Sequence, residues 1–342
     1  MDSISQIALG AGVGELVLGK KIGNKALLIG AIAGTVPDLD VFVNMFVHLS
    51  ESEALHIHRS YSHAAVPQLF IALPFTYLTY ILFKRKIAFS RWYLLWYLCF
   101  LTHTLLDCCT TYGTQLFLPF SNFLVGLNNI SVVDPLYTIP FLLLLIILLF
   151  YNKESRTRRI IAWLSVIIST AYIGYSTINK FQSEKFFKQA LQQQKIEYTT
   201  LSTSPTLFTS WLWNMVAYND SMIYVSEYSV FQKSQEATIH AYKRNLDLLN
   251  ESKSSDAVKT LLWFSQGKYF VQKGTNDTLD FFNIKWGRGD YTQTNPADAF
   301  RYYVKIYKDK NGNYDFASVE PKFKRRDIKK YFSLVWHRIF DY

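Results

Sequence analysis

AAVPQLFIALPFTYLTYILF, residues 64–83, contains no charged residue and is long enough to cross a lipid bilayer as a single helix. Directly before it lies HIHRSYSH, residues 56–63, which contains three histidines and one arginine. Polar groups are costly in hydrocarbon, so a polar cluster at a membrane border usually has a function. The pair of segments therefore predicts a spanning helix with a candidate site at its mouth.

Further apolar segments on both sides of this one predict an α-helical polytopic membrane domain over residues 1–180. The strong candidates are 92–109, 135–151 and 160–179, with shorter apolar segments at 4–18 and 26–36. Glycines at positions 10, 14 and 19 favour close helix packing. Residues 181–342 carry most of the polar side chains and predict a soluble α+β domain, with helices at 180–195 and 233–266 and strand-rich segments at 197–231 and 268–319.

Three basic loops predict the orientation in the membrane, because positive loops prefer the cytoplasm. They are GKKIGNK at 19–25, KRKIAFSR at 84–91 and NKESRTRR at 152–159. With all three inside, residues 37–63, 103–134 and the whole C-terminal domain lie on the outer face. We therefore expect a multi-pass protein with an extracytoplasmic C-terminal domain.

The remaining composition excludes some classes. The net charge of +10 is spread over loops and the tail without a groove-binding motif, so no nucleic acid partner is expected. The cysteines, Cys99, Cys108 and Cys109, lack CxxC spacing, and Cys108 and Cys109 are interpreted as packing residues. The first residues lack a basic region and a cleavage site, which favours a retained first helix over a removable signal.

Seven acids and histidines fall on the predicted outer face and are metal-ligand types: Asp38, Asp40, His58, His63, His103, Asp107 and Asp134. His103 and Asp107 are four residues apart and share one helical face, so they can bind one ion. His58 and His63 are five apart and fit a loop end and a helix start. Asp38 and Asp40 suit an extended or turning backbone after Pro37. Seven ligands exceed one tetrahedral zinc, so two bridged ions are expected, with zinc, manganese and iron all open.

Simpler interpretations remain for several residues. Asp134 precedes a proline and would cap a helix. Glu15, within the first helix, is open between packing and function. His48 and His56 are interpreted as ordinary polar residues.

The opening segment 1–42, HRSYSH at 58–63, HTLLDCCTTYGTQLFLPFS at 103–121 and SVVDP at 131–135 resemble signatures of a bacterial family. It is the LexA-regulated, membrane-bound, predicted metal-dependent hydrolase family of the YdjM type. The resemblance covers residues 1–180 and continues weakly through SPTLFTSWLW at 204–213. It implies hydrolase chemistry at the bacterial inner membrane and metal-binding roles for the seven residues above. The family is in turn distantly similar to zinc phospholipase C and P1-type nucleases, which favours a phosphoester substrate.

The hypothesis is thus a membrane-bound metal-dependent hydrolase acting on a phosphoester or lipid-headgroup substrate at the outer face. A free acid, Asp38 or Asp107, would orient the attacking water or act as base. Arg59 would pair with a phosphate oxygen, or else anchor to headgroups. Tyr112 and Thr114 would hydrogen-bond the substrate. Membrane lipids are the expected partners. The alternatives are a transporter or a noncatalytic scaffold with a structural metal.

Overall fold

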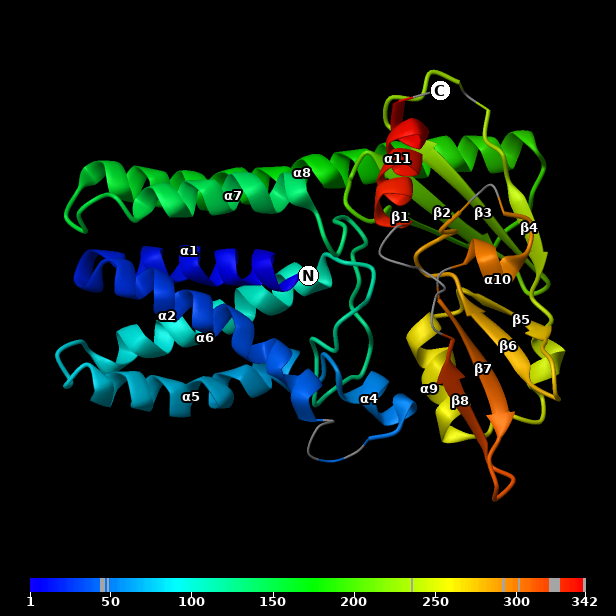
Figure 1. Ribbon diagram of the computed structural model, residues 1–342, viewed down its shortest axis with the longest axis horizontal. Coiled ribbons are helices and arrows are strands. Elements are labelled where there is room, and N and C mark those ends of the chain that lie inside the picture. The colour runs from blue at the N-terminus through cyan, green and yellow to red at the C-terminus, as the bar shows by residue number, and fades with distance from the viewer. Residues whose placement is uncertain are drawn as a thin grey trace. The chain divides into compact units, whose positions relative to one another are not determined.

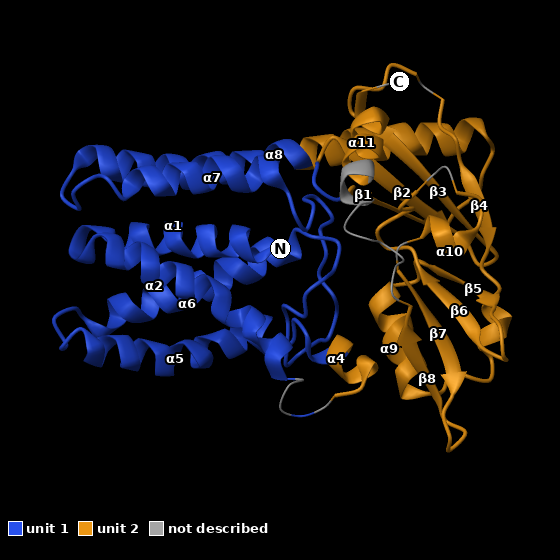
Figure 2. Cartoon of the chain, in the orientation of Figure 1, with its two compact units in different colours: residues 1–48, 56–176, 207–209 blue, residues 49–55, 177–206, 210–342 orange. Residues whose placement is uncertain are grey.

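The computed structural model describes residues 1–43, 47, 49–234, 236–290, 293–300, 302–319 and 327–340, so His48 lies outside the described residues. The chain forms two compact units (Figures 1 and 2). Unit 1 comprises residues 1–48, 56–176 and 207–209, and unit 2 comprises residues 49–55, 177–206 and 210–342. The predicted helical N-terminal region followed by an α+β C-terminal region is confirmed at this level.

Unit 1 is a bundle of helices joined by short turns at one end and longer segments at the other (Figure 1). Its elements are α1 (Ser3–Ile22), α2 (Asn24–Thr35), η1 (Val36–Phe42), η2 (Tyr61–His63), α5 (Ala65–Leu82), α6 (Phe89–Cys108), α7 (Pro135–Leu148) and the first part of α8 (Arg156–Gln193). Among the described helices, α5 and α8 are long and apolar enough to cross a membrane, and α7 is apolar but shorter. The segments predicted as separate helices at 160–179 and 180–195 are one helix, since nothing between them breaks it.

α1 and α2 pack through glycines (Figure 1). A methyl group on Gly10 or Gly14 would collide with the backbone of α2 near Gly30, and one on Gly34 would collide with the backbone at Gln6. This close approach, which small residues permit between membrane helices, holds the end of α2 against α1. It places η1, which directly follows α2, next to α6 and η2.

The turn end of unit 1 contains a buried ion pair. The Glu15 carboxylate accepts hydrogen bonds from Nε and Nη2 of Arg158, both at 2.7 Å. Arg158 Nη1 also donates to the Asn24 side chain, at 2.8 Å, and to the carbonyls of Leu148 and Tyr151. Glu15 therefore packs α1 against the α7–α8 turn. Of the two roles left open for this residue, packing and function, the contacts favour packing.

The long segment between α6 and α7 folds over the other end of unit 1. Thr114 and Val125 form a short antiparallel bridge within it. Its backbone also reaches the histidine segment, because Gln115 N–H donates to the Arg59 carbonyl at 3.1 Å and the Leu116 carbonyl accepts from Ala65 N–H at 3.1 Å. The segment is thus fixed to the residues just before α5.

Unit 2 contains two four-stranded antiparallel sheets, ordered β1-β2-β3-β4 and β5-β6-β7-β8. The strands are β1 (Thr200–Pro205), β2 (Leu212–Tyr218), β3 (Met222–Ser229), β4 (His240–Lys243), β5 (Tyr269–Lys273), β6 (Leu279–Asn283), β7 (Tyr303–Lys308) and β8 (Tyr314–Ser318). The helical elements are α4 (Glu51–Ile57), which begins in this unit, the end of α8, η3 (Leu246–Leu249), α9 (Asp256–Ser265), α10 (Pro296–Ala299) and α11 (Asp327–Phe340).

The helix predicted over 233–266 is wrong for most of its length. Residues 240–243 pair with β3 as an edge strand, and among the described residues of this range only 256–265 form an α-helix, beside the short 3₁₀-helix η3. The strand wins because Tyr242 stacks on Phe270 and joins the apolar core of the sheets. Helix α11 was not predicted, although Tyr331, Val335 and Ile339 line one buried face at four-residue spacing.

Candidate metal centre

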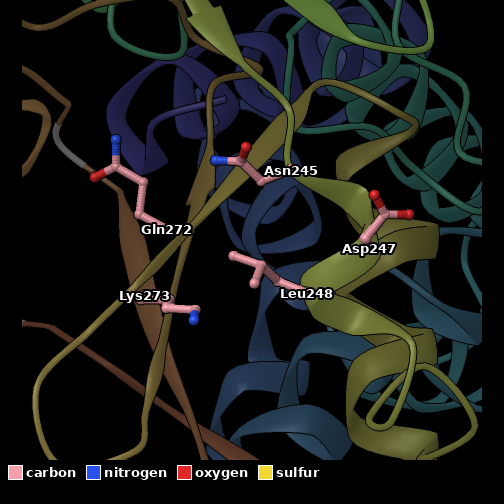
Figure 3. A pocket seen from close by; sticks show the side chains of 5 residues that line it. All are labelled: Asn245, Asp247, Leu248, Gln272 and Lys273. Atoms are coloured by element: carbon pink, nitrogen blue, oxygen red, sulfur yellow. The ribbon is translucent and has the colours of Figure 1, made fainter.

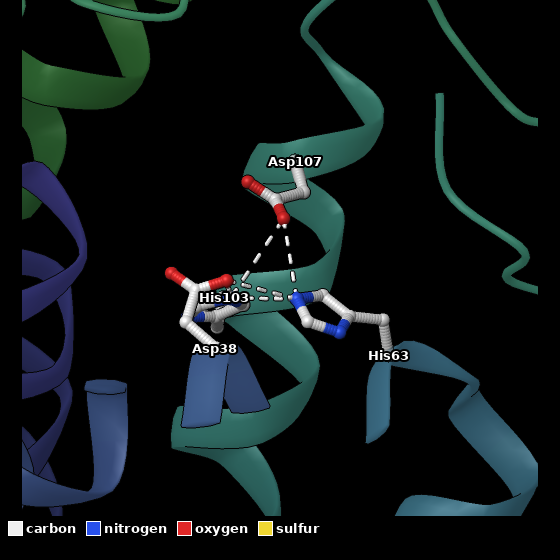
Figure 4. Close-up of side chains that lie close together, drawn as sticks. All are labelled: Asp38, His63, His103 and Asp107. Carbon is white, nitrogen blue, oxygen red and sulfur yellow. Dashed lines mark hydrogen bonds and ion pairs between the residues drawn. The ribbon is translucent and has the colours of Figure 1, made fainter. Parts of the chain in front are cut away.

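Four side chains of unit 1 converge at the end opposite the Glu15–Arg158 pair (Figure 4). His103 and Asp107 lie one turn apart on α6, as their spacing predicted. Asp38 comes from η1, and His63 ends η2 directly before α5. One ligand atom from each lies within 4.8 Å of every other, and all but Asp38 are buried. We call Asp38, His63, His103 and Asp107 the four-donor group.

The distances within the four-donor group fit a tetrahedral ion. Nε2 of His63 lies 3.1 Å from Nε2 of His103 and 3.3 Å from Oδ1 of Asp38. Nε2 of His103 lies 3.4 Å from the same Asp38 oxygen. Oδ2 of Asp107 lies 3.4 and 3.7 Å from the two imidazole nitrogens. A tetrahedral zinc with bonds of about 2.0–2.1 Å would hold its ligand atoms about 3.3 Å apart.

The hydrogen bonds behind the two histidines fix which nitrogen faces the group. His103 Nδ1 lies 2.7 Å from the Gly34 carbonyl, which can only accept, so this nitrogen carries the proton. His63 Nδ1 lies 2.9 Å from Ser62 Oγ and 3.4 Å from Asp40 Oδ2. With both Nδ1 atoms protonated, two Nε2 lone pairs face each other at 3.1 Å. Such an arrangement requires a shared cation, either a metal ion or a proton.

Asp107 is held on its other side by three groups. Its Oδ1 accepts from Gln6 Nε2 at 3.0 Å and from the amino group of Met1. Its Oδ2 lies 3.1 Å from Arg59 Nε, yet the geometry of this contact is not that of a hydrogen bond. Within the described part of the chain, no hydrogen bond reaches this buried oxygen. An unsatisfied carboxylate oxygen facing two imidazole nitrogens fits a metal ligand.

In the metal-free protein, the carboxylates and imidazoles of the four-donor group shift each other's pKa values. Burial disfavours the charged imidazolium of His63, but the adjacent carboxylates of Asp107, Asp38 and Asp40 outweigh it and raise the pKa of His63 to about 10. Burial would raise the pKa of Asp38, yet hydrogen bonds to His103 and His63 hold it well below its usual range. A proton on His63 is thus the natural occupant that a metal ion would displace.

Asp40 and His58, both predicted as ligands, lie beside the four-donor group and bind each other. His58 Nδ1 lies 3.0 Å from Asp40 Oδ1. Asp40 Oδ2 accepts from the Arg59 N–H and from Ser62 Oγ, both at 2.9 Å. Because η1 is a 3₁₀-helix with three residues per turn, Asp38 and Asp40 point in different directions, whereas an extended segment would have placed both on one face. Asp40 thereby orients His63 from behind, as carboxylates do for metal-binding histidines.

Arg59 is buried beside the four-donor group. Its backbone is left-handed, with φ of 58°, and its guanidinium contacts Asp107 Oδ2, Thr110 Oγ1 and the ring of Tyr112. Non-glycine residues in this conformation concentrate at functional sites. Thr114 is fully buried in the bridge to Val125, so its hydroxyl does not face solvent. Tyr112, in contrast, lies over both Arg59 and His58.

Asp134 is not part of the four-donor group. Its carboxylate caps α7 by accepting from the Leu136 N–H at 3.1 Å, and it accepts from the Tyr172 hydroxyl at 2.9 Å. This is the helix-capping role that the proline at position 135 favours. Gln6, which donates to Asp107, and Ser62, which donates to Asp40, were not predicted from the sequence. The one signal for Gln6 was its position as a lone amide within the apolar first helix.

Unit 2 contains a separate hollow of about 440 Å³ (Figure 3). It is lined by Asn245, Asp247, Leu248, Gln272 and Lys273. Asn245 is used structurally, since its side chain donates to the Val271 carbonyl at 2.8 Å. With one acid and no histidine or cysteine in its lining, this hollow does not resemble the metal centre.

Comparison with known proteins shows the family of this chain. The chain is 25% identical over 222 residues to the uncharacterized protein YfhP of Bacillus subtilis (strain 168), an alignment that covers 62% of this chain and 64% of that protein. No solved structure matches the chain. The sequence model described as YdjM inner membrane protein matches residues 1–183, which include every residue of the four-donor group, and the chain therefore belongs to the YdjM inner membrane protein family.

Proposed function

We propose that this protein is a metal-dependent hydrolase of the bacterial inner membrane, with its metal ion bound by the four-donor group. The observation that carries the proposal is the pair of imidazole Nε2 atoms 3.1 Å apart, flanked by two carboxylates. Two imidazoles and two carboxylates suit zinc, manganese or iron, and the near-tetrahedral spacing favours zinc. Because a catalytic zinc needs one position open to water, the exposed Asp38 would yield its place on the ion to a water that ionises near neutral pH, while His63, His103 and Asp107 would hold the ion.

The four-donor group has the ligands for one ion. The expected second ion would require Asp40 and His58 to exchange their mutual hydrogen bond for metal coordination. In the structure, Asp40 instead lies behind His63, and His58 holds Asp40. We therefore propose one tightly bound ion, with Asp40 and His58 completing its surroundings.

The residues around the group suggest how it would treat a substrate. The Asp38 side chain is 25% exposed, whereas the side chains of His63, His103 and Asp107 are at most 1% exposed, so substrate and water would approach from the Asp38 side. Asp38 is then the residue placed to orient an attacking water. Arg59 adds a fixed positive charge next to Asp107, which favours an anionic substrate such as a phosphoester or a lipid headgroup.

The arrangement of unit 1 supports placing this site at the outer membrane face. The basic loops gather at the opposite end, where Lys153 Nζ lies 3.4 Å from the Lys21 carbonyl and Lys25 Nζ lies over the Phe83 ring (Figure 1). Positive loops prefer the cytoplasm, so the metal end would face outward. We propose a multi-pass arrangement with the C-terminal domain on that outer side.

Hydrolysis assays on detergent-purified protein test the proposal. We expect release of p-nitrophenol from mono- and bis-p-nitrophenyl phosphate, or of headgroup from phospholipid vesicles, that stops with a chelator and returns with zinc or manganese. Asp38→Asn should abolish this activity, while His56→Ala, a change at an exposed histidine of the same segment, should retain it. Activity that survives both the chelator and Asp38→Asn would refute the hydrolase.

A noncatalytic membrane protein with a structural metal is the second candidate, favoured by the burial of three of the four donors. It would bind the ion with the same residues but show no turnover in these assays. A transporter would instead require polar groups along a path across the membrane.

A further inference from the structure

The segment between α6 and α7 has an unusual composition for a connection outside a helix. Residues 108–133 contain no Lys, Arg, Asp or Glu. Three phenylalanines within this segment are exposed: Phe117 to 52%, Phe120 to 82% and Phe123 to 60%. Large apolar side chains gathered at a surface indicate an interaction site.

The phenylalanines are held by local hydrogen bonds. The Phe117 carbonyl accepts from the N–H groups of Phe120 and Ser121, at 2.9 and 3.2 Å, and Phe123 N–H donates to Ser121 Oγ at 3.2 Å. The bridge between Thr114 and Val125 closes the segment at its base. The rings are therefore displayed by an ordered turn, which we call the phenylalanine loop (residues 116–124).

The phenylalanine loop lies next to both the metal centre and a candidate membrane span. Its first residue, Leu116, accepts a hydrogen bond from Ala65 N–H at 3.1 Å, and Ala65 is the first residue of α5 and two residues from His63. The exposed apolar surface continues along α5 through Val66, Phe70 and Leu73. Since α5 is apolar and long enough to span a bilayer, lipid that covers it would also reach the loop.

We propose that Phe117, Phe120 and Phe123 insert into the lipid bilayer beside the metal centre, and that the substrate is a membrane-resident amphiphile with a phosphoester headgroup. Aromatic side chains on an uncharged turn suit the boundary between headgroups and acyl chains. The insertion stands on the loop and α5 alone, whereas the substrate class rests on the proposed hydrolase.

Nitroxide accessibility in vesicles of phosphatidylethanolamine and phosphatidylglycerol tests the insertion. A label at Phe120→Cys, in a Cys109→Ser background, is compared with labels at Ile167→Cys on exposed α8 and at Asn152→Cys in a basic loop. We expect the label at position 120 to collide more often with oxygen than with a water-soluble nickel chelate, as the label at position 167 should. A label as open to the nickel chelate as that at 152 would overturn insertion, and one shielded from both would indicate a protein partner and overturn it too.

Substrate choice is tested separately with the triple variant Phe117→Ser, Phe120→Ser and Phe123→Ser. Its hydrolysis of vesicle phospholipid should fall at least about tenfold, the effect of losing roughly one buried aromatic anchor, while p-nitrophenyl phosphate turnover is retained. An equal loss on both substrates with unchanged metal content, or no loss on either, would overturn the amphiphile assignment. Absence of turnover in the unmodified protein would instead refute the hydrolase and leave the accessibility result standing.

Discussion

The two ends of unit 1 both bury charged side chains, but they satisfy them differently. At the turn end, both oxygens of Glu15 accept hydrogen bonds at 2.7 Å, and Arg158 donates to three further acceptors. At the other end, the Nε2 atoms of His63 and His103 lie 3.1 Å apart, and Asp107 Oδ2 accepts no hydrogen bond within the described residues. A buried ion pair with all its partners is a structural link, whereas an incomplete set of donors and acceptors is consistent with a binding site.

The largest effect is expected where a complete pair is broken. Arg158→Ala leaves the Glu15 carboxylate buried without its partner, which should destabilise the protein by about 3–5 kcal/mol. Thermal unfolding in detergent measures this loss. Metal content per folded chain should not change, because the four-donor group lies at the other end, and a loss of metal would show that the two ends are coupled.

Removing one donor from the incomplete set should affect binding more than folding. His103→Ala is expected to raise the dissociation constant for zinc at least about 100-fold, more than the loss of an outer hydrogen bond does. A titration against a chromophoric chelator measures the constant. His56→Ala serves as the matched control, and equal affinity in the two variants would exclude His103 as a ligand.

A smaller loss of zinc affinity is expected from Asp40, which contacts His63 on the side away from the four-donor group. Asp40→Asn keeps the shape but weakens the orientation of His63, and it should reduce zinc affinity about 10–100-fold. The same titration applies here. If the loss equals that of His103→Ala, Asp40 is a direct ligand, as the sequence analysis expected.

The pH dependence follows from His63, whose pKa is raised from 6.5 to about 10 in the metal-free protein. Its proton stabilises the metal-free fold below pH 6.5, and this contribution is lost as the pH rises through 10. Zinc must displace the same proton, so zinc affinity should rise about tenfold per pH unit over that window. Calorimetry in buffers of different ionisation enthalpy should detect proton release, and zinc uptake without it would contradict this ionisation.

The smallest effect is expected at Asp134. Asn is also a good helix cap, so Asp134→Asn should change stability by less than about 1 kcal/mol and leave zinc affinity unaltered. A clear fall in metal content in this variant would return Asp134 to the ligand set.

The helices of unit 1 were accessible from sequence because each is an apolar segment with a basic loop at one end. The 233–266 region was not, since Tyr242 is held in a strand by stacking on Phe270, a contact between distant residues. The continuity of α8 was also missed, because the change from apolar to polar residues near position 180 marks a change of surroundings and not a helix end.

For the site, sequence spacing correctly predicted only the relation between His103 and Asp107. Asp38 and His63 were grouped with these two residues only because the basic loops predicted that all four lie on the outer membrane face. It could not separate ligands from the residues that support them, because the Asp40–His58, Arg59–Asp107 and Gln6–Asp107 contacts depend on how distant segments meet. The role of an acid next to a helix, as at Asp134, is likewise decided by which side it faces.

Elemental analysis of purified protein tests the central claim most directly. We predict close to one zinc or manganese ion per chain, lost in the His63→Ala, Asp107→Ala double variant and retained in His56→Ala. If neither the unmodified protein nor the double variant binds metal after incubation with zinc or manganese, the four-donor group is not a metal centre.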